Sequence, residues 1–138
     1  MSETVPRPSQ HARAFIQYWL PVAAYCGLIF IQSSFPSPVK EPDIPFADKF
    51  LHMMGYALLG ALFYRAYGSL WFGGKHWRVA LFSVLSAGFY GISDEIHQYF
   101  VPGRSADVMD AAADFVGAAL GVLIYMGLFK KRVARLPR

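Results

Sequence analysis

Acidic, basic and amide side chains recur at helical spacing in three short segments of an otherwise apolar sequence. Residues three or four apart share one face of a helix. The polar residues of the three segments are, in chain order, Asp48, Lys49, His52 and Tyr56; Asp94, Glu95, His97 and Gln98; and Asp107, Asp110 and Asp114. Carboxylates and imidazoles in such numbers could exchange protons, hold a cation or bind a polar headgroup.

His52 and Asp114 lie within apolar sequence. Each stands one helical turn, about 6 Å, below an acidic residue nearer the surface, Asp48 and Asp110 respectively. Ionisable groups at such depth usually face the interior of a bundle or a wet cavity. We therefore expect both residues to be functional. A cationic partner is also needed, because burying several carboxylates without compensation is costly, and Lys49 and Arg104 are the candidates.

Simpler explanations remain open for the other polar residues. Asp48 could only cap the helix that follows it, and Tyr56 could only fill the core. Lys49 and Glu95 could be solvated charges at the membrane surface. Gly117 and Gly121 form a G-x-x-x-G pair, which favours close helix packing over a ligand contact.

The sequence carries no established catalytic pattern. H-E-x-x-H, G-x-S-x-G and a phosphate-binding glycine loop are all missing. His52 or a carboxylate could still act as a general base. Asp94, His97 and nearby acids could coordinate a hard divalent cation, but their spacing does not define a metal site. We therefore assign no catalytic residue, no metal ligand and no cofactor from the sequence.

Four apolar helices must position these polar residues. Hydrophobic residues make up 55% of the 138 residues and charged residues 16%, against about 25% charged in soluble proteins. Each apolar run supports a helix long enough to cross the hydrocarbon core, whereas a soluble bundle would need a polar face on each helix. The predicted helices are 14–31, 48–65, 78–100 and a fourth that begins at Asp107 or Asp110 and ends at Phe129.

The connections between these helices are short or rich in proline. Residues 32–47 contain four prolines and are predicted to form an extended outer loop, with Asp48 as the N-cap of the next helix. Residues 66–77 form a short turn with a Gly-Gly pair, flanked by Trp71 and Trp77 at the membrane interface. Pro21 should bend the first helix, which is too long and lacks the cleavage site for a signal peptide.

The basic residues predict the orientation. Of 13 Lys and Arg residues, ten fall in residues 1–13, 65–78 and 130–138, and three fall on the opposite side. The positive-inside rule then places both termini in the cytoplasm. Nucleic-acid binding is not indicated by the net charge of +4, because no basic stripe is present. The single Cys26 cannot form an internal disulfide.

The sequence thus predicts an all-α, four-helix integral membrane bundle with both termini inside and a Pro-rich outer loop. The expected organisation is a cytoplasmic tail over residues 1–13, a transmembrane domain over 14–129 and a basic cytoplasmic tail over 130–138. We expect a multi-pass protein of the plasma or inner membrane.

Several motifs resemble those of the VanZ-like family. They are the segments IQSSFP, DKFLHMMGY and SDEIHQYFVPGRSADVMDAAADFVGAALG, which follow one another in the family's order. The family pattern is matched here by Ser33, Ser34 and Pro36; Asp48, Lys49, His52 and Tyr56; Asp94, Glu95 and Gln98; Pro102, Gly103 and Arg104; and Asp110. Asp114 stands where many members carry Asn. The family takes its name from a protein associated with teicoplanin resistance.

The resemblance implies a cell-envelope membrane protein, and three functional hypotheses follow. In the first, the chain binds an anionic envelope lipid or a lipid-linked cell-wall intermediate, with a possible link to glycopeptide resistance. The second is an enzyme acting on such a substrate, and the third a structural or regulatory membrane protein. The predicted ligand-binding residues are Asp48, Lys49, His52, Tyr56, Asp94, Glu95, Gln98, Arg104, Asp110 and Asp114. Arg104 and Lys49 are expected to hold a phosphate, and Arg104 to pair at rest with Asp110.

Overall fold

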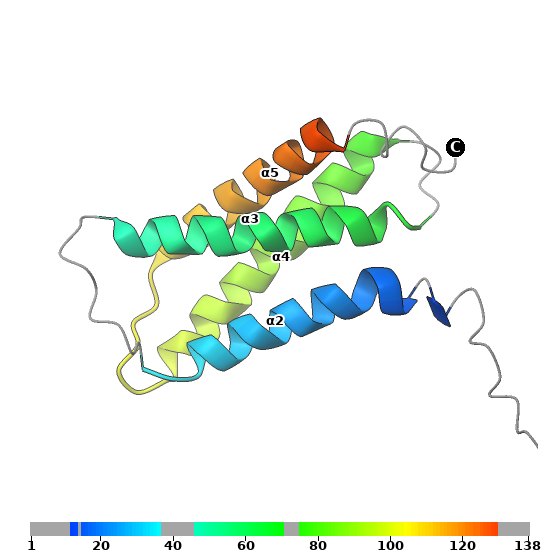
Figure 1. Ribbon diagram of the computed structural model, residues 1–138. Helices are drawn as coiled ribbons and strands as arrows, with labels where there is room; N and C mark the ends of the chain where they lie inside the picture. The colour runs from blue at the N-terminus through cyan, green and yellow to red at the C-terminus, as the bar shows by residue number, and fades with distance from the viewer. Residues whose placement is uncertain (1–11, 14, 37–45, 71–74, 130–138) are drawn as a thin grey trace, which may run out of the picture.

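The computed structural model describes residues 12–13, 15–36, 46–70 and 75–129, and their regular secondary structure is entirely helical (Figure 1). The elements are η1 (Phe15–Trp19), a π-helix, and the α-helices α2 (Leu20–Ser33), α3 (Ala47–Tyr67), α4 (His76–Tyr99) and α5 (Val108–Leu128). The predicted all-α fold of four helices is confirmed. The basic tail and nearly all of the N-terminal tail lie outside the described residues, as do Trp71 and most of the Pro-rich loop.

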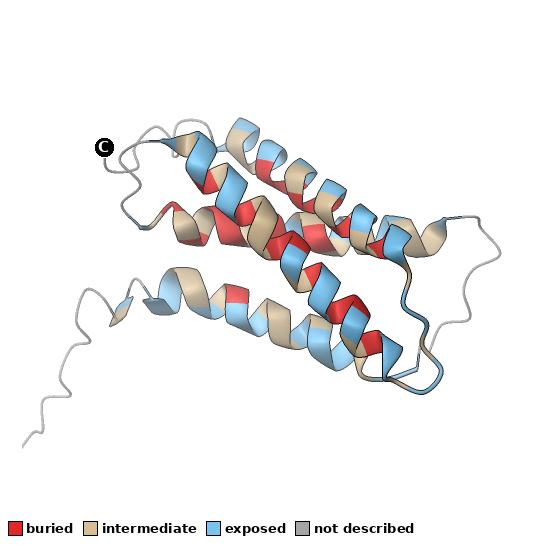
Figure 2. Cartoon of the chain, turned by 180° about the vertical axis from the view of Figure 1, so that it is seen from behind, coloured by how far each residue is buried: buried red, intermediate tan, exposed pale blue. Residues whose placement is uncertain are grey.

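Three helical segments are long and apolar enough to cross a membrane, namely Phe15–Ser33, His76–Tyr99 and Val108–Leu128. α3 is equally long, with 21 residues, but it is not among these three segments, and the charged residues Asp48, Lys49 and Arg65 interrupt its apolar sequence. Large apolar side chains are exposed along every α-helix, and Figure 2 shows buried residues confined to the inward faces. This distribution is expected of helices that turn an apolar surface to lipid.

The first span changes from π-helix to α-helix immediately before Pro21. Proline has no backbone N–H to donate, and the first turn of an α-helix is where this loss is tolerated. The span then continues to Ser33, two residues beyond the predicted end.

α3 and α5 approach each other most closely, at glycines. A methyl group on Gly117 would overlap the carbonyl oxygen of Met53, and one on Gly121 would overlap that of Ala57. Close packing at the G-x-x-x-G pair is therefore confirmed. Because Met53 pairs with Gly117 and Ala57 with Gly121, the two helices run in the same direction and begin at the same end of the bundle.

α2 is the outermost helix and buries only Val22 and Ser33. Two tyrosine hydroxyls attach it to its neighbours. Tyr25 donates to the carbonyl of Gly55 in α3 at 3.1 Å, and Tyr90 of α4 donates to the carbonyl of Cys26 at 2.6 Å. Hydrogen bonds thus supplement the limited packing of this helix.

The start of α3 differs from the prediction, whereas the start of α5 agrees with it. Asp48 is not the N-cap of α3, because the helix begins a residue earlier and Phe46, with φ 65°, takes that position without a side-chain cap. Asp48 instead lies in the first turn. Asp107 caps α5, its carboxylate accepting from the backbone N–H of Met109 at 2.8 Å.

Candidate functional site

The polar residues gather where α3 and α5 begin and where α2 and α4 end (Figure 1). Lys49 of α3 lies beside Asp110 of α5, and His52 lies one turn further, beside Asp114. The glycine contacts continue the same α3–α5 interface, so the backbone approach that they permit is what brings these pairs together. The site is therefore a product of helix packing.

Lys49 forms the centre of an outer cluster with Asp48, Asp107 and Asp110. Its ammonium nitrogen lies 2.8 Å from Asp48, 2.5 Å from Asp107 and 2.8 Å from Asp110. The three N–H groups of the ammonium thus face three carboxylates. The side chains of Asp48 and Asp107 are 41% and 42% exposed, whereas that of Asp110 is 11% exposed. Lys49 is confirmed as a cationic partner of the acids.

Asp107 joins α5 to both neighbouring helices. The hydrogen bond from Lys49, together with the one from the Met109 N–H, holds the pKa of Asp107 below its ordinary value. Its backbone N–H donates to Glu95 of α4 at 2.8 Å. The start of α5 is thereby fixed to α3 through a side chain and to α4 through the backbone.

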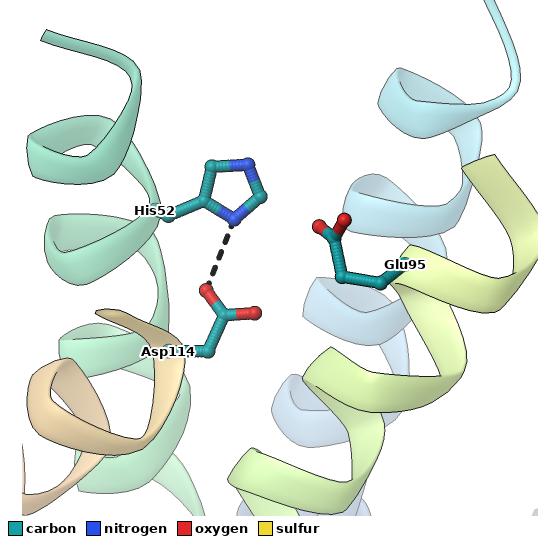
Figure 3. Close-up of side chains that lie close together, drawn as sticks. All are labelled: His52, Glu95 and Asp114. Atoms are coloured by element: carbon teal, nitrogen blue, oxygen red, sulfur yellow. Dashed lines mark hydrogen bonds and ion pairs between the residues drawn. The ribbon is translucent and has the colours of Figure 1, made fainter. Parts of the chain in front are cut away.

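His52, Glu95 and Asp114 form an inner cluster, each contributed by a different helix (Figure 3). The imidazole Nδ1 of His52 lies 3.0 Å from Asp114, and its Nε2 lies 3.9 Å from Asp110. Asp114 is fully buried and Glu95 is 6% exposed. Gly91 leaves room for this arrangement, because a methyl group there would overlap the Asp114 carboxylate.

Three buried oxygens at the inner cluster have no hydrogen-bond partner among the described residues. They are Oδ2 of Asp114, Oε1 of Glu95 and the hydroxyl oxygen of Tyr56. The Tyr56 ring lies parallel to the ring of His52, with centroids 6.3 Å apart. Its hydroxyl interacts electrostatically with the acids of α4 and α5. Unsatisfied buried oxygens of this kind are uncommon and require an explanation.

Asp94 and Gln98 lie toward α2. Asp94 accepts hydrogen bonds from Ser33 at 2.5 Å and from Gln98 at 3.0 Å. All three side chains are buried. Asp94 is therefore satisfied by protein groups, and its contacts connect α2 to α4.

Arg104 does not join the acidic residues, and its predicted pairing with Asp110 is wrong. Its guanidinium donates to the backbone carbonyls of Phe35 and Gln32, each at 2.9 Å. None of the ion pairs found among the described residues includes it. The last carbonyls of a helix lack partners within the helix, and Arg104 supplies donors to the end of α2.

The site carries a surplus of negative groups. Its six carboxylates are those of Asp48, Asp94, Glu95, Asp107, Asp110 and Asp114. Lys49 and His52 are the two groups that can oppose them within the ion pairs described. Such a surplus suits ligands that donate hydrogen bonds or carry positive charge.

Some contacts at the site were not anticipated. Ser33 appeared only as part of a motif and not as a partner of Asp94. His97 stacks on Phe30 with ring centroids 4.6 Å apart and shares a hydrogen bond with Ser34 at 3.0 Å. The signal available was the serine pair at the end of an apolar run, where helix ends and side-chain hydroxyls often meet polar partners.

Comparison with known proteins gives one match. The family model described as VanZ/LLP1 matches residues 7–130, which covers every residue of the site. No curated protein and no solved structure matches the chain.

Proposed function

The chain belongs to the VanZ/LLP1 family, and from this premise we propose that its polar end binds the headgroup of an anionic envelope lipid or lipid-linked cell-wall intermediate. The observation that carries the proposal is Lys49, a half-buried cation surrounded by carboxylates at the end of a bundle whose helices expose large apolar side chains. A headgroup at the membrane surface would reach this end while its acyl or prenyl chains remain in lipid.

A headgroup that carries hydroxyl groups beside its phosphate fits this site better than a bare phosphate, because the surplus carboxylates repel an anion that brings no hydrogen-bond donors. The exposed carboxylate of Asp48, which contacts Lys49 alone among the described residues, can turn to water and release an N–H group of Lys49 to a phosphate oxygen. The remaining carboxylates are hydrogen-bond acceptors and suit hydroxyl donors. Phosphatidylglycerol and lipid-linked sugars share this combination, whereas phosphatidic acid offers phosphate without extra hydroxyls.

Binding of defined lipids to the purified chain tests this proposal. Native mass spectrometry should show phosphatidylglycerol retained in preference to phosphatidic acid, and both in preference to phosphatidylcholine. A polyprenyl phosphate linked to a sugar provides the second ligand class. Equal retention of all four lipids would contradict the proposal.

Lys49→Gln tests the proposed role of the cation. Because this change alone leaves three carboxylates without their partner, the double variant Lys49→Gln/Asp110→Asn preserves the local charge balance. We expect it to fold and to lose about tenfold in phosphatidylglycerol affinity. Arg65→Gln is the control, since Arg65 lies at the other end of α3, over the ring of Tyr18. Unchanged affinity in the double variant would remove Lys49 from the site.

Enzymatic action on such a lipid is the second candidate, and the His52–Asp114 contact favours it. A carboxylate 3.0 Å from an imidazole nitrogen orients a histidine for general base catalysis. His52→Gln should then abolish turnover of a bound lipid while leaving its retention intact. A link to glycopeptide resistance is also part of the proposal, and growth assays with teicoplanin test it. Location in the plasma or inner membrane is tested separately, by fractionation of the cell membranes.

A further inference from the structure

The inner cluster has the composition of a metal site. We propose that His52, Glu95 and Asp114 bind a divalent first-row transition metal ion such as zinc or manganese. Each residue offers one ligand atom, and these atoms lie within 4.8 Å of one another. Figure 3 shows the imidazole and the two carboxylates, which come from three helices, directed toward a common space. The proposal does not depend on lipid binding.

Unpartnered oxygens at this place provide independent support. One carboxylate oxygen of Asp114 and one of Glu95 are buried without a hydrogen-bond partner, and both residues are more than nine-tenths buried. A carboxylate oxygen taken from water needs a hydrogen bond, a proton or a cation. His52 Nδ1 contacts the other carboxylate oxygen of Asp114 and satisfies neither of these two, so the cluster has unused capacity for a cation.

The outer cluster makes an instructive comparison. Asp48, Asp107 and Asp110 also bring three ligand atoms together, but the Lys49 ammonium already lies between them. The Lys49 ammonium therefore occupies the place in the outer cluster where a metal ion would bind. The inner cluster has the same density of acceptors and no lysine or arginine in its ion pairs.

The ligand set selects the class of metal. Calcium and magnesium take oxygen ligands, whereas an imidazole nitrogen favours zinc, iron, manganese and related ions. Two carboxylates and a neutral imidazole together carry the charge that a divalent ion neutralises. Ligand atoms about 2.0–2.2 Å from zinc lie about 3.4 Å from each other in a tetrahedron, whereas those of the cluster lie up to 4.8 Å apart, so binding requires the side chains to close by up to about 1.4 Å. The long Glu95 side chain can provide this movement.

Three protein ligands leave at least one coordination position open, as in catalytic zinc sites. The buried hydroxyl of Tyr56 is without a hydrogen-bond partner among the described residues, and its ring lies over that of His52. Tyr56 could therefore bind the metal directly or donate to the oxygen of a further ligand.

Cobalt provides a direct probe of the site. The full-length, untagged chain, purified in detergent and treated with EDTA, is titrated with Co²⁺ while visible absorption is recorded, and Zn²⁺ is then added in competition. We expect one equivalent of Co²⁺ to bind and to be displaced by Zn²⁺. His52→Ala and Asp114→Asn should each weaken binding by more than about 100-fold, since loss of a partner that merely orients a ligand already costs 10–100-fold.

Two control variants distinguish this site from its surroundings. His97→Ala removes the histidine that contacts Ser34 and Phe30, and Asp48→Asn removes an outer carboxylate. Both should bind Co²⁺ like the unmodified chain. An unmodified chain that binds no Co²⁺, or binding that survives His52→Ala, would overturn the proposal.

A second measurement on the unmodified chain applies if the variants do not fold. Zinc X-ray absorption should show imidazole nitrogen among oxygen ligands, and a spectrum with oxygen ligands alone would overturn the proposal. Because the probe is the metal without lipid, failure here leaves the headgroup proposal intact. Likewise, the lipid retention of the Lys49 double variant does not bear on the metal site, because Co²⁺ binding is measured separately.

Discussion

The hydroxyl of Ser33 donates to the carboxylate of Asp94 at 2.5 Å, and both side chains are buried. This contact joins the end of α2 to the last turns of α4 across 61 positions of sequence. Since α2 buries few other residues, the contact is a principal attachment of that helix.

Ser33→Ala should lower the free energy of unfolding by about 1–3 kcal/mol, because it leaves a buried carboxylate oxygen of Asp94 without its donor. Thermal unfolding in detergent measures the change. Ser34→Ala is the matched control at the next position, where the side chain is only half-buried, and its effect should be smaller. An equal effect of the two substitutions would show that burial of the contact is unimportant.

Gly121→Ala should destabilise the chain by about 1–3 kcal/mol. The added methyl group overlaps the carbonyl oxygen of Ala57, so α3 and α5 must separate, and His52 must move away from Asp114. The same substitution at Gly127 meets no atom within 4 Å and should stabilise the helix by about 0.5–1 kcal/mol. Thermal unfolding of both variants checks this, and similar melting temperatures would contradict the close α3–α5 contact.

Arg104→Ala should lower stability by about 1 kcal/mol while preserving the retention of phosphatidylglycerol, because the guanidinium contacts carbonyls of α2 and the following residues. Arg104→Lys keeps the charge but cannot span the carbonyls of Gln32 and Phe35 with two separate nitrogens, so its stability should fall between those of the other two forms. Native mass spectrometry and thermal unfolding supply the measurements. A loss of lipid in Arg104→Lys without a loss of stability would instead return Arg104 to the ligand site.

The orientation of the chain remains a prediction from its basic residues. After Cys26 is replaced by Ser, a cysteine at position 38 should react with an impermeant thiol reagent applied from outside the cell. A cysteine at position 69 should react only after the membrane is opened. The reverse pattern would place both termini outside, together with the polar end of the bundle on the cytoplasmic face.

The sequence predicted the helices well because each is specified by its own residues. Long apolar runs fix their number, and proline and glycine fix the breaks between them. The lining of the site was also predictable in part, since Asp48, His52 and Asp114 stand at helical spacing within apolar surroundings. Helix starts were less secure, as Phe46 shows, because its left-handed conformation has no signature in a bulky side chain.

Partnerships between helices could not be derived in the same way. Charge alone predicted that Arg104 would pair with the acids, yet its guanidinium donates to backbone carbonyls at the end of α2. Sequence spacing says nothing about which carbonyls will lie nearby after folding. For the same reason Gly117 and Gly121 indicated close packing without identifying α3 as the helix that they contact.

The contact between His52 and Asp114 spans 62 positions, and this separation has a consequence for biosynthesis. A ribosome adding about 5–20 residues per second needs about 3–12 s to synthesise the chain between them. For most of that interval α3 is complete, while the acids of α5 that match Lys49 and His52 have not been made. The nascent chain must therefore keep two cationic or ionisable groups of α3 near water or an insertion factor until its last helix emerges.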